Sequence, residues 1–302
     1  MTGAAGQRIG MERGRLIIGV DSGGTLCRAA VNGPSGGVEV AGAGCNWTTD
    51  PTRTAKAIRA VLMSLAAKAG IGSTDLRGAA VHIGAAGIVN ERDADALGHA
   101  LADMLGNVTV TDDLDCTVAG ALGQTGDGFV AGLGTGSFLA ARQAGSLRRV
   151  GGWGLVLGDE ASGAWLGRAL LARALHVRDA LADPSPLIAR AMDRFGNDPA
   201  EVVRFAATAT PTDFATLAPM VAEAFDRGDP AASDLLNVGA GWIERGLHAL
   251  GWQPGARLCL LGGLGPLYAR ALPSYLSDAV VPPLGTALDG ALSLAQARPV
   301  AP

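Results

Sequence analysis

Lysine is scarce in this chain of 302 residues: Lys56 and Lys68 are the only lysines among its 24 basic residues. A Walker A loop needs a lysine directly after a glycine, and both of these lysines follow an alanine. The sequence therefore excludes a P-loop nucleotide site. The formal net charge is -4 and the basic residues form no runs, so we expect neither a nucleic acid nor a membrane as partner.

Cysteines are few and scattered, and long apolar runs are absent. Cys27, Cys45, Cys116 and Cys259 lie far apart and form no CxxC pair, so their spacing favours neither a zinc site nor a disulfide framework. No run of 18 apolar residues could span a bilayer, and the first residues lack the apolar segment of a signal peptide. We expect a cytoplasmic protein that acts on small molecules, with a leader before Arg15 that has no fixed structure.

Several catalytic motifs are missing as well. The sequence contains no HExxH and no cluster of histidine and cysteine. Its histidines are isolated and are expected to be structural or solvated: His82, His99, His176 and His248. The absence of these two patterns excludes the common zinc-protease class.

The residues that are present indicate an α/β protein of two domains. The length and the 48% of hydrophobic residues favour two cores, which we place at residues 15–120 and 121–302, with the last helix able to pack back on the first domain. Apolar periodicity predicts helices over Pro51–Ala69 and residues 91–105, a mostly helical region over residues 161–250 and a closing helix over residues 283–297. Short apolar runs predict strands at residues 15–21, 26–31, 76–87, 107–113, 128–142 and 257–265.

Two glycine turns repeat at domain-scale spacing, each between two apolar runs. The first is Ser22, Gly23, Gly24 and Thr25, and the second is Gly134, Thr135, Gly136 and Ser137. A hairpin needs glycine only to reach positive φ, so one such turn alone indicates little. The repetition favours two related domains. A Rossmann motif would need a helix directly after the glycines, whereas both turns lead into a second strand-like run.

A glycine turn directs several backbone N–H groups the same way and can bind phosphate oxygens without lysine. The hydroxyl groups of Thr25, Thr135 and Ser137 add donors beside these N–H groups. Asp21 precedes the first turn, where its carboxylate is placed to hold water on a Mg²⁺ that bridges phosphates. Its alternative role is to cap the turn.

Acidic residues follow one predicted strand: Asp112, Asp113 and Asp115. Aspartate at a helix N-terminus satisfies unpaired N–H groups without any catalysis. Three acids exceed that need, and the carboxyl ends of strands are where open α/β sheets bind ligands. Asp112, nearest the strand end, is our candidate for the base that accepts a hydroxyl proton during phosphoryl transfer, and the choice between Asp112 and Asp113 stays open.

Residues 151–171 combine a glycine-rich loop, Gly152 and Gly154 included, with Asp159 and Glu160 before a helix. One acid can cap that helix, and the second suits a neutral polyol whose hydroxyl groups donate to carboxylates. Asn46 beside Trp47 offers an amide and an aromatic face for the same ligand, although these two residues could equally form a turn with a core aromatic.

The segments GVDSGGT, VTDD, GLGTGS, GGWGLVLGDEASGAWLGR and LLGGLG, in this order, resemble the BadF/BadG/BcrA/BcrD ATPase family, specifically its amino-sugar kinase branch. The resemblance covers roughly residues 17–295. It implies an actin-like ATPase (ribonuclease H-like, Hsp70/sugar kinase) fold of two duplicated domains, with ATP in the cleft between them. The implied reaction is transfer of the γ-phosphate, with Mg²⁺, to the 6-hydroxyl of N-acetylglucosamine or glucosamine.

The resemblance also implies roles for particular residues. Residues 22–25 form the first phosphate loop and residues 134–137 the second. Gly262, Gly263 and Gly265 border the adenosine. The catalytic base falls on Asp112, and the sugar contacts fall on Asn46, Asp159 and the loop from Gly152 to Gly154.

Other activities of the same family stay open. Its iron–sulfur activators of dehydratases and reductases share the nucleotide loops but bind a cluster through paired cysteines, which the spacing here does not obviously supply. A non-catalytic sugar or ATP sensor is the other alternative. The segment from Gly84 to Gly87 stands where kinases of this branch have a small polar residue near the sugar. The acetylation state of the sugar and the oligomeric state, a homodimer included, are not determined by the sequence.

Overall fold

The computed structural model describes residues 16–32 and 37–297, and the predicted leader lies outside the described residues. The chain divides into two compact units. Unit 1 comprises the described residues up to Gly126 together with those from Pro283, and unit 2 comprises Asp127–Pro282.

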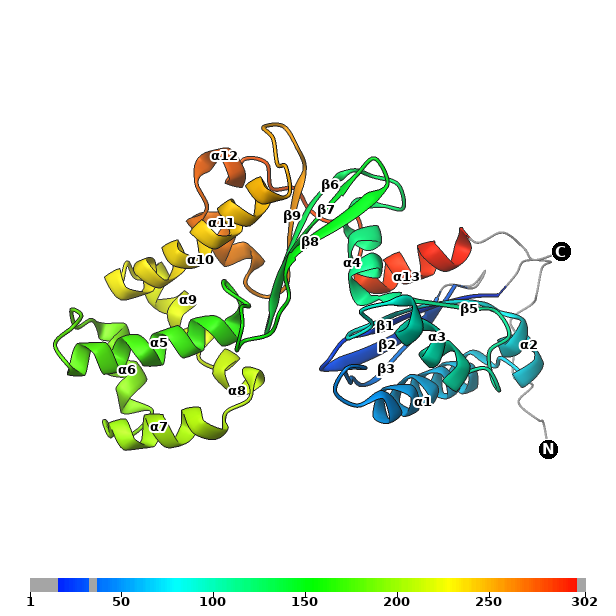
Figure 1. The fold of residues 1–302 in the computed structure, drawn as a ribbon, viewed down its shortest axis with the longest axis horizontal. Helices are drawn as coiled ribbons and strands as arrows, with labels where there is room; N and C mark the ends of the chain where they lie inside the picture. Colours follow the sequence, from blue (N-terminus) through cyan, green and yellow to red (C-terminus); the bar gives the residue numbers. More distant parts are fainter. Residues whose placement is uncertain (1–15, 33–36, 298–302) are drawn as a thin grey trace, which may run out of the picture. The chain divides into compact units, whose positions relative to one another are not determined.

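Unit 1 is built on a mixed five-stranded sheet, shown in Figure 1. Its strand order is β3-β2-β1-β4-β5, with β1, β2 and β3 antiparallel and with β4 and β5 parallel to β1. The strands are β1 (Ile17–Ser22), β2 (Leu26–Val31), β3 (Val38–Ala43), β4 (Ala80–Ala85) and β5 (Val108–Asp112). Strand β3, at the edge of the sheet, was not predicted from the sequence.

Helices cover both faces of this sheet. Helix α1 and α3 lie on one face, and α4 and α13 pack together on the other (Figure 1). The helices of unit 1 are α1 (Pro51–Ala69), α2 (Ser73–Gly78), α3 (Glu91–Ala100), α4 (Asp113–Leu122) and α13 (Ala287–Gln296). The prediction of α1 is confirmed at both ends, whereas α3 is shorter than predicted because the chain turns away after Ala100.

Alternation along β1 decides which side chains enter the core. Ile18 and Val20 are fully buried among the apolar side chains of α1 and α3. Gly19 faces α13 so closely that an added Cβ would lie 2.6 Å from the backbone nitrogen of Leu292. The next residue on this second face is Asp21, which the strand thereby places on the side of α4 and α13.

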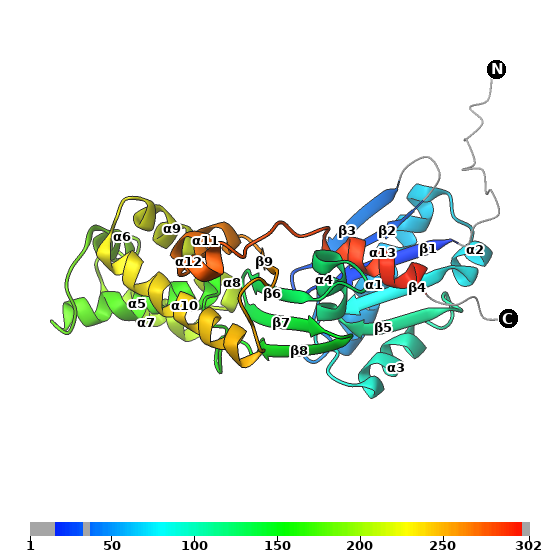
Figure 2. The same cartoon turned by 90° about the horizontal axis from the view of Figure 1, so that it is seen from above.

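Unit 2 contains a mixed four-stranded sheet (Figure 2). Its order is β8-β7-β6-β9, with β6, β7 and β8 antiparallel and with β9 parallel to β6. The strands are β6 (Gly128–Leu133), β7 (Ser137–Gln143), β8 (Ser146–Gly151) and β9 (Leu258–Leu261). This connectivity repeats that of β1 to β4, which is the duplication expected of the fold.

Six helices lie between β8 and β9 in the sequence, as the predicted helical region requires. They are α5 (Gly163–Arg178), α6 (Pro186–Asp193), α7 (Pro199–Thr208), α8 (Pro211–Ala215), α9 (Ala218–Asp226) and α10 (Pro230–Ala249), and α11 (Gly265–Ala271) and α12 (Ser274–Ser277) follow β9. Together with the sheet they enclose the core of unit 2. In the parts of the chain that the structure describes, no helix combines the length and apolar character needed to cross a membrane.

Candidate active site

The parallel strands of unit 1 end side by side. Ser22 at the end of β1 pairs with Ala85 at the end of β4, and Ala85 pairs with Asp112 at the end of β5. Their loops therefore leave the sheet at one edge, which is where α/β sheets bind ligands. Side-chain alternation places Asp21 on the opposite face of the sheet from Asp112.

The first glycine turn contains glycines that the fold itself does not require. The N–H of Gly23 donates to the carbonyl of Leu26 at 2.9 Å, and neither Gly23 nor Gly24 has a positive φ. A Cβ added to Gly24 would meet no atom within 4 Å, and one added to Gly23 would make only ordinary contact. Neither backbone conformation nor packing explains these two glycines. The turn leaves space that a ligand could fill.

Gly44 supports this turn and was not identified from the sequence. Its N–H donates to the carbonyl of Thr25 at 3.1 Å, and an added Cβ would lie 2.2 Å from the carbonyl oxygen of Gly23. The segment after β3 therefore lies directly against the back of the turn. No local sequence signal could have revealed this approach, because the contact joins two separate segments.

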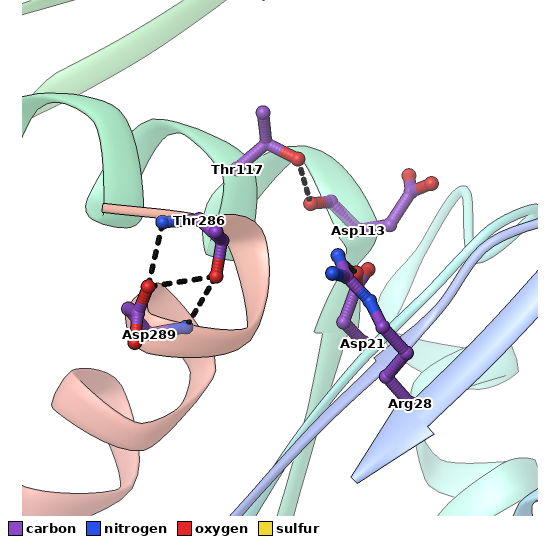
Figure 3. Close-up of polar contacts among 6 residues, drawn as sticks. All are labelled: Asp21, Arg28, Asp113, Thr117, Thr286 and Asp289. Carbon is purple, nitrogen blue, oxygen red and sulfur yellow. Dashed lines mark hydrogen bonds and ion pairs between the residues drawn. The ribbon is translucent and has the colours of Figure 1, made fainter. Parts of the chain in front are cut away.

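Arg28 is a second residue that sequence reasoning missed. Its Nη2 atom contacts Oδ2 of Asp21 at 2.7 Å, as Figure 3 shows. The hairpin pairs Asp21 directly with Arg28, so the register of the predicted turn could have indicated the contact. The Asp21 carboxylate is 14% exposed and the Arg28 side chain 30% exposed.

The acids after β5 have different surroundings. Asp112 caps α4, since its Oδ1 accepts the N–H of Leu114 at 2.9 Å. Asp113 begins the helix, and its carbonyl accepts the hydroxyl of Thr117 at 3.0 Å (Figure 3). Burial, and then the charge of nearby Asp112, raises the pKa of the Asp115 carboxyl. Asp112 thus has the helix-capping role that was the alternative to catalysis, and Asp113 and Asp115 follow it in the first turn of α4.

Asn46 and Trp47 lie at the same edge of unit 1. The Oδ1 of Asn46 accepts the N–H of Thr48 at 3.0 Å, and the N–H of Trp47 donates to the carbonyl of Ala86 at 2.9 Å. Ala86 belongs to the segment after β4 that was expected near the sugar. The Trp47 side chain is 8% exposed and belongs to the core of unit 1. This burial favours the core role for Trp47 over ring stacking on a ligand.

The second glycine turn is fixed by a helix. The carbonyls of Gly134 and Thr135 accept the N–H groups of Gly163 and Ala164, at 2.8 and 3.2 Å, from the first turn of α5. An added Cβ at Gly134 would find no atom closer than 4.0 Å, so this glycine also leaves free space. The buried Ser137 hydroxyl, expected to face a phosphate, donates instead to the carbonyl of Glu160 at 2.6 Å.

Asp159 contacts both this turn and the loop that carries Gly152 and Gly154. Its Oδ1 accepts the N–H of Gly154 at 3.1 Å, and its Oδ2 would lie 2.9 Å from a Cβ on Gly136. Burial raises the pKa of the Asp159 carboxyl, against the opposing effect of hydrogen bonds from the Gly154 and Ser137 amides. Asp159 and Ala161 have φ values of 59° and 66°, a conformation that costs non-glycine residues free energy and is concentrated at functional sites.

The end of β9 adjoins the second turn. Gly262 has a φ of 83°, and an added Cβ would lie 2.5 Å from the carbonyl oxygen of Leu133, so the fold requires this glycine. Gly265 is also required, since its Cβ would approach the carbonyl of Leu260 at 3.0 Å. Gly263 has open space around it. Free space therefore borders the ends of both β6 and β9.

The predicted residues thus gather in two groups, one in each unit. In unit 1 they are Asp21, Ser22, Gly23, Gly24, Thr25, Asn46, Trp47 and Asp112. In unit 2 they are Gly134, Thr135, Gly136, Ser137, Gly152, Gly154, Asp159, Gly262, Gly263 and Gly265.

Metal and cluster chemistry can be tested against these groups. Among the described residues, no three His, Cys, Asp or Glu side chains are arranged to hold a metal ion by themselves. Asp21 and Asp113 nevertheless provide carboxylate oxygens at the edge that carries the first turn, a donor set that suits Mg²⁺ with most of its waters retained. All four cysteines are buried, and none forms a disulfide.

Comparison with known proteins identifies the class of this molecule. A ROK family glucokinase from Streptomyces griseus, solved in complex with glucose and AMPPNP, is 20% identical, with a TM-score of 0.53 over 93% of this chain and 98% of that one. This likeness concerns the fold alone. With its two mixed sheets, the chain has the α/β fold of the actin-like ATPases, as predicted.

The family follows from sequence. Residues 18–281 match the model of the BadF/BadG/BcrA/BcrD ATPase family, and the chain belongs to that family. The chain is 27% identical over 281 residues to the glucosamine kinase GspK of Vibrio cholerae, covering 92% of this chain and 95% of the relative. A solved structure of a proposed N-acetylglucosamine kinase from Chromobacterium violaceum is 32% identical, with a TM-score of 0.83 over 93% of this chain and 99% of that one.

Proposed function

We propose that this protein is a kinase that transfers the γ-phosphoryl group of ATP to the 6-hydroxyl of an amino sugar, glucosamine or N-acetylglucosamine. The observation that carries the proposal is the free space at Gly24, Gly134 and Gly263, three glycines that the fold does not require. Backbone N–H groups in such turns bind phosphate oxygens without lysine. The relatives named above support the choice of sugar.

Asp112 is the proposed base. Its carboxylate would accept the proton of the sugar hydroxyl as the hydroxyl oxygen bonds to the γ-phosphorus and the bond from that phosphorus to the ADP oxygen breaks. A positioned base of this kind contributes about 10²–10⁴ to the rate. The cap that Asp112 makes to Leu114 fixes the carboxylate at the end of β5.

Mg²⁺ fits the acidic edge of unit 1. Asp21 would hold it through water, with Asp113 nearby, and the ion would neutralise charge on the phosphates. For the sugar, we propose contacts from Asn46, from Asp159 and from the loop that carries Gly152 and Gly154. We assign Trp47 the supporting role of fixing the Asn46 turn, because the ring lies in the core.

The cysteines bear on the iron–sulfur alternative. Cys27, Cys116 and Cys259 are fully buried and Cys45 is 8% exposed, whereas a cluster shared between subunits needs cysteines at a surface. A sugar sensor would bind the same ligands without turnover.

A screen for ADP release tests the proposal, with MgATP and a panel of hexoses and amino sugars. We expect release that depends on glucosamine or N-acetylglucosamine and that is lost in Asp112→Asn. ADP release without any sugar would favour the activator function. Calorimetric binding of sugar and nucleotide without ADP release would favour a sensor, and either result would overturn the kinase proposal.

A further inference from the structure

The Asp21 carboxylate is held by an arginine of the neighbouring strand. The contact measures 2.7 Å, and the hairpin register places the two Cα atoms opposite each other. Asp21 is largely buried and Arg28 is less so. The strand pairing thus places the two residues opposite each other, and their ion pair is partly buried.

Two further acids, Asp113 on α4 and Asp289 on α13, belong to the helices on the same side of the sheet as Asp21. On α4, the Cα of Asp113 would lie 3.3 Å from a Cβ on Gly84, the residue paired with Asp21. On α13, the Thr286 amide and hydroxyl donate to Asp289 and chiefly lower the pKa of its carboxyl, and the charge of Arg28 lowers it further. Figure 3 shows these residues together. The pair of Asp21 and Arg28 therefore lies on the side of the sheet that carries two more acidic residues, and Arg28 is the basic residue in contact with Asp21.

We propose that Arg28 is a positioning residue that prevents Asp21 from binding a divalent cation until a nucleotide is present. This inference rests on the proposed function. The guanidinium partly neutralises Asp21 and fixes the orientation of its carboxylate. A cation would gain little from Asp21 alone, because it would have to compete with the charge of Arg28. A bound triphosphate brings its own negative charge and restores the attraction.

The chain offers a matched control. Arg59 contacts Asp103 with Nη2 to Oδ1 at 2.7 Å, also within unit 1. This pair joins α1 to the segment after α3 and lies far in sequence from both glycine turns. Arg59→Gln removes an ion pair of the same length without altering the edge that carries Asp21.

The test is a Mn²⁺ titration of the full chain followed by electron paramagnetic resonance, without nucleotide and then with ADP. We expect Arg28→Gln to bind Mn²⁺ without nucleotide about tenfold more tightly than the wild type, because the repulsion between the guanidinium and the cation is removed. Arg59→Gln should match the wild type. In Arg28→Gln combined with Asp21→Asn, the gain should disappear.

An unchanged nucleotide-free affinity in Arg28→Gln would overturn the inference and leave Arg28 a structural role. Arg28→Lys keeps the charge and should bind Mn²⁺ as the wild type does. If Arg28→Gln does not fold, Arg28→Lys provides the test. The inference then fails if Arg28→Lys binds Mn²⁺ without nucleotide about tenfold more tightly than the wild type. Because the titration involves no sugar and no turnover, it gives its answer even if the ADP-release screen shows that the protein is not a kinase.

Discussion

The two glycine turns have similar sequences and different supports. In unit 1, four residues lie between the paired Ser22 and Cys27, whereas in unit 2 three residues lie between the paired Leu133 and Ser137. Both turns leave open space at a glycine. The two turns therefore share the open space at a glycine, although they differ in length.

The supports differ in kind. Backbone from Gly44 lies against the first turn, and a fixed ion pair flanks it. The second is fastened by two amides of α5 and by the Asp159 carboxylate against Gly136. A side chain at Gly136 should therefore disturb the fold as well as a ligand, while one at Gly24 should disturb the ligand alone.

The largest expected effect concerns Asp112, the proposed base at the end of β5 in unit 1. Asp112→Asn should lower kcat by about 10²–10⁴ with little change in nucleotide affinity, because an amide oxygen can still cap Leu114 but cannot take up a proton. Steady-state kinetics and calorimetry with ADP measure the two quantities. Turnover near the wild-type value would remove Asp112 from the mechanism.

Asp113→Asn is the matched variant for that experiment. We expect it to lower kcat less than Asp112→Asn does, because Asp113 lies on the α4 side of the sheet with Asp21, where it would support Mg²⁺ and would not accept the hydroxyl proton. If Asp113→Asn instead loses the larger share of kcat, the base is Asp113, and the assignment by position at the strand end is reversed.

A pair of alanine substitutions measures the difference between the two turns directly. Gly24→Ala places a methyl group in open space, so its thermal stability should stay at the wild-type value while nucleotide affinity falls about tenfold or more, the loss of one hydrogen bond to a charged group. Gly136→Ala places a Cβ 2.9 Å from Asp159 and should cost about 1–3 kcal/mol of unfolding free energy. Thermal melts and ADP calorimetry on both variants test this.

The contrast fails if Gly24→Ala unfolds as early as Gly136→Ala, which would mean that the first turn has a support not visible in its contacts. It also fails if Gly24→Ala binds ADP as tightly as the wild type. In that case the space at Gly24 would not be a phosphate site.

Part of this organisation could be predicted from the local sequence, and part could not. Helix α1 was predicted with its observed bounds, because Asp50 caps it, Pro51 begins it and Gly70 ends it in the left-handed conformation. The edge strands β3 and β8 were missed, since small or polar residues give them little apolar signal. The burial of Trp47 and the approach of Gly44 depend on distant segments, so no local pattern could indicate them.

A smaller effect should appear in the pH dependence of stability. Burial raises the pKa of Asp159 in the folded chain, so its ionised form costs folding free energy, and protonation at lower pH relieves that cost. The stability of the wild type relative to Asp159→Asn should therefore increase as the pH falls through the raised folded pKa, and should level off below the ordinary aspartate value of about 3.9. Thermal melts between pH 7 and pH 3.5 would reveal a difference of the opposite sign if Asp159 were instead held as a stabilised carboxylate.

The smallest expected effect concerns the cysteines, which are buried in both units. Burial chiefly raises the pKa of Cys27 to about 11 and also raises the pKa values of Cys116 and Cys259, so few reactive thiolates exist at neutral pH. Iodoacetamide should therefore modify the native protein slowly and leave its activity nearly unchanged, whereas all four thiols should react in guanidinium. Mass spectrometry counts the adducts. Rapid modification of two thiols with loss of activity would show cysteines at a surface, the arrangement that an iron–sulfur activator needs and that a sugar kinase does not.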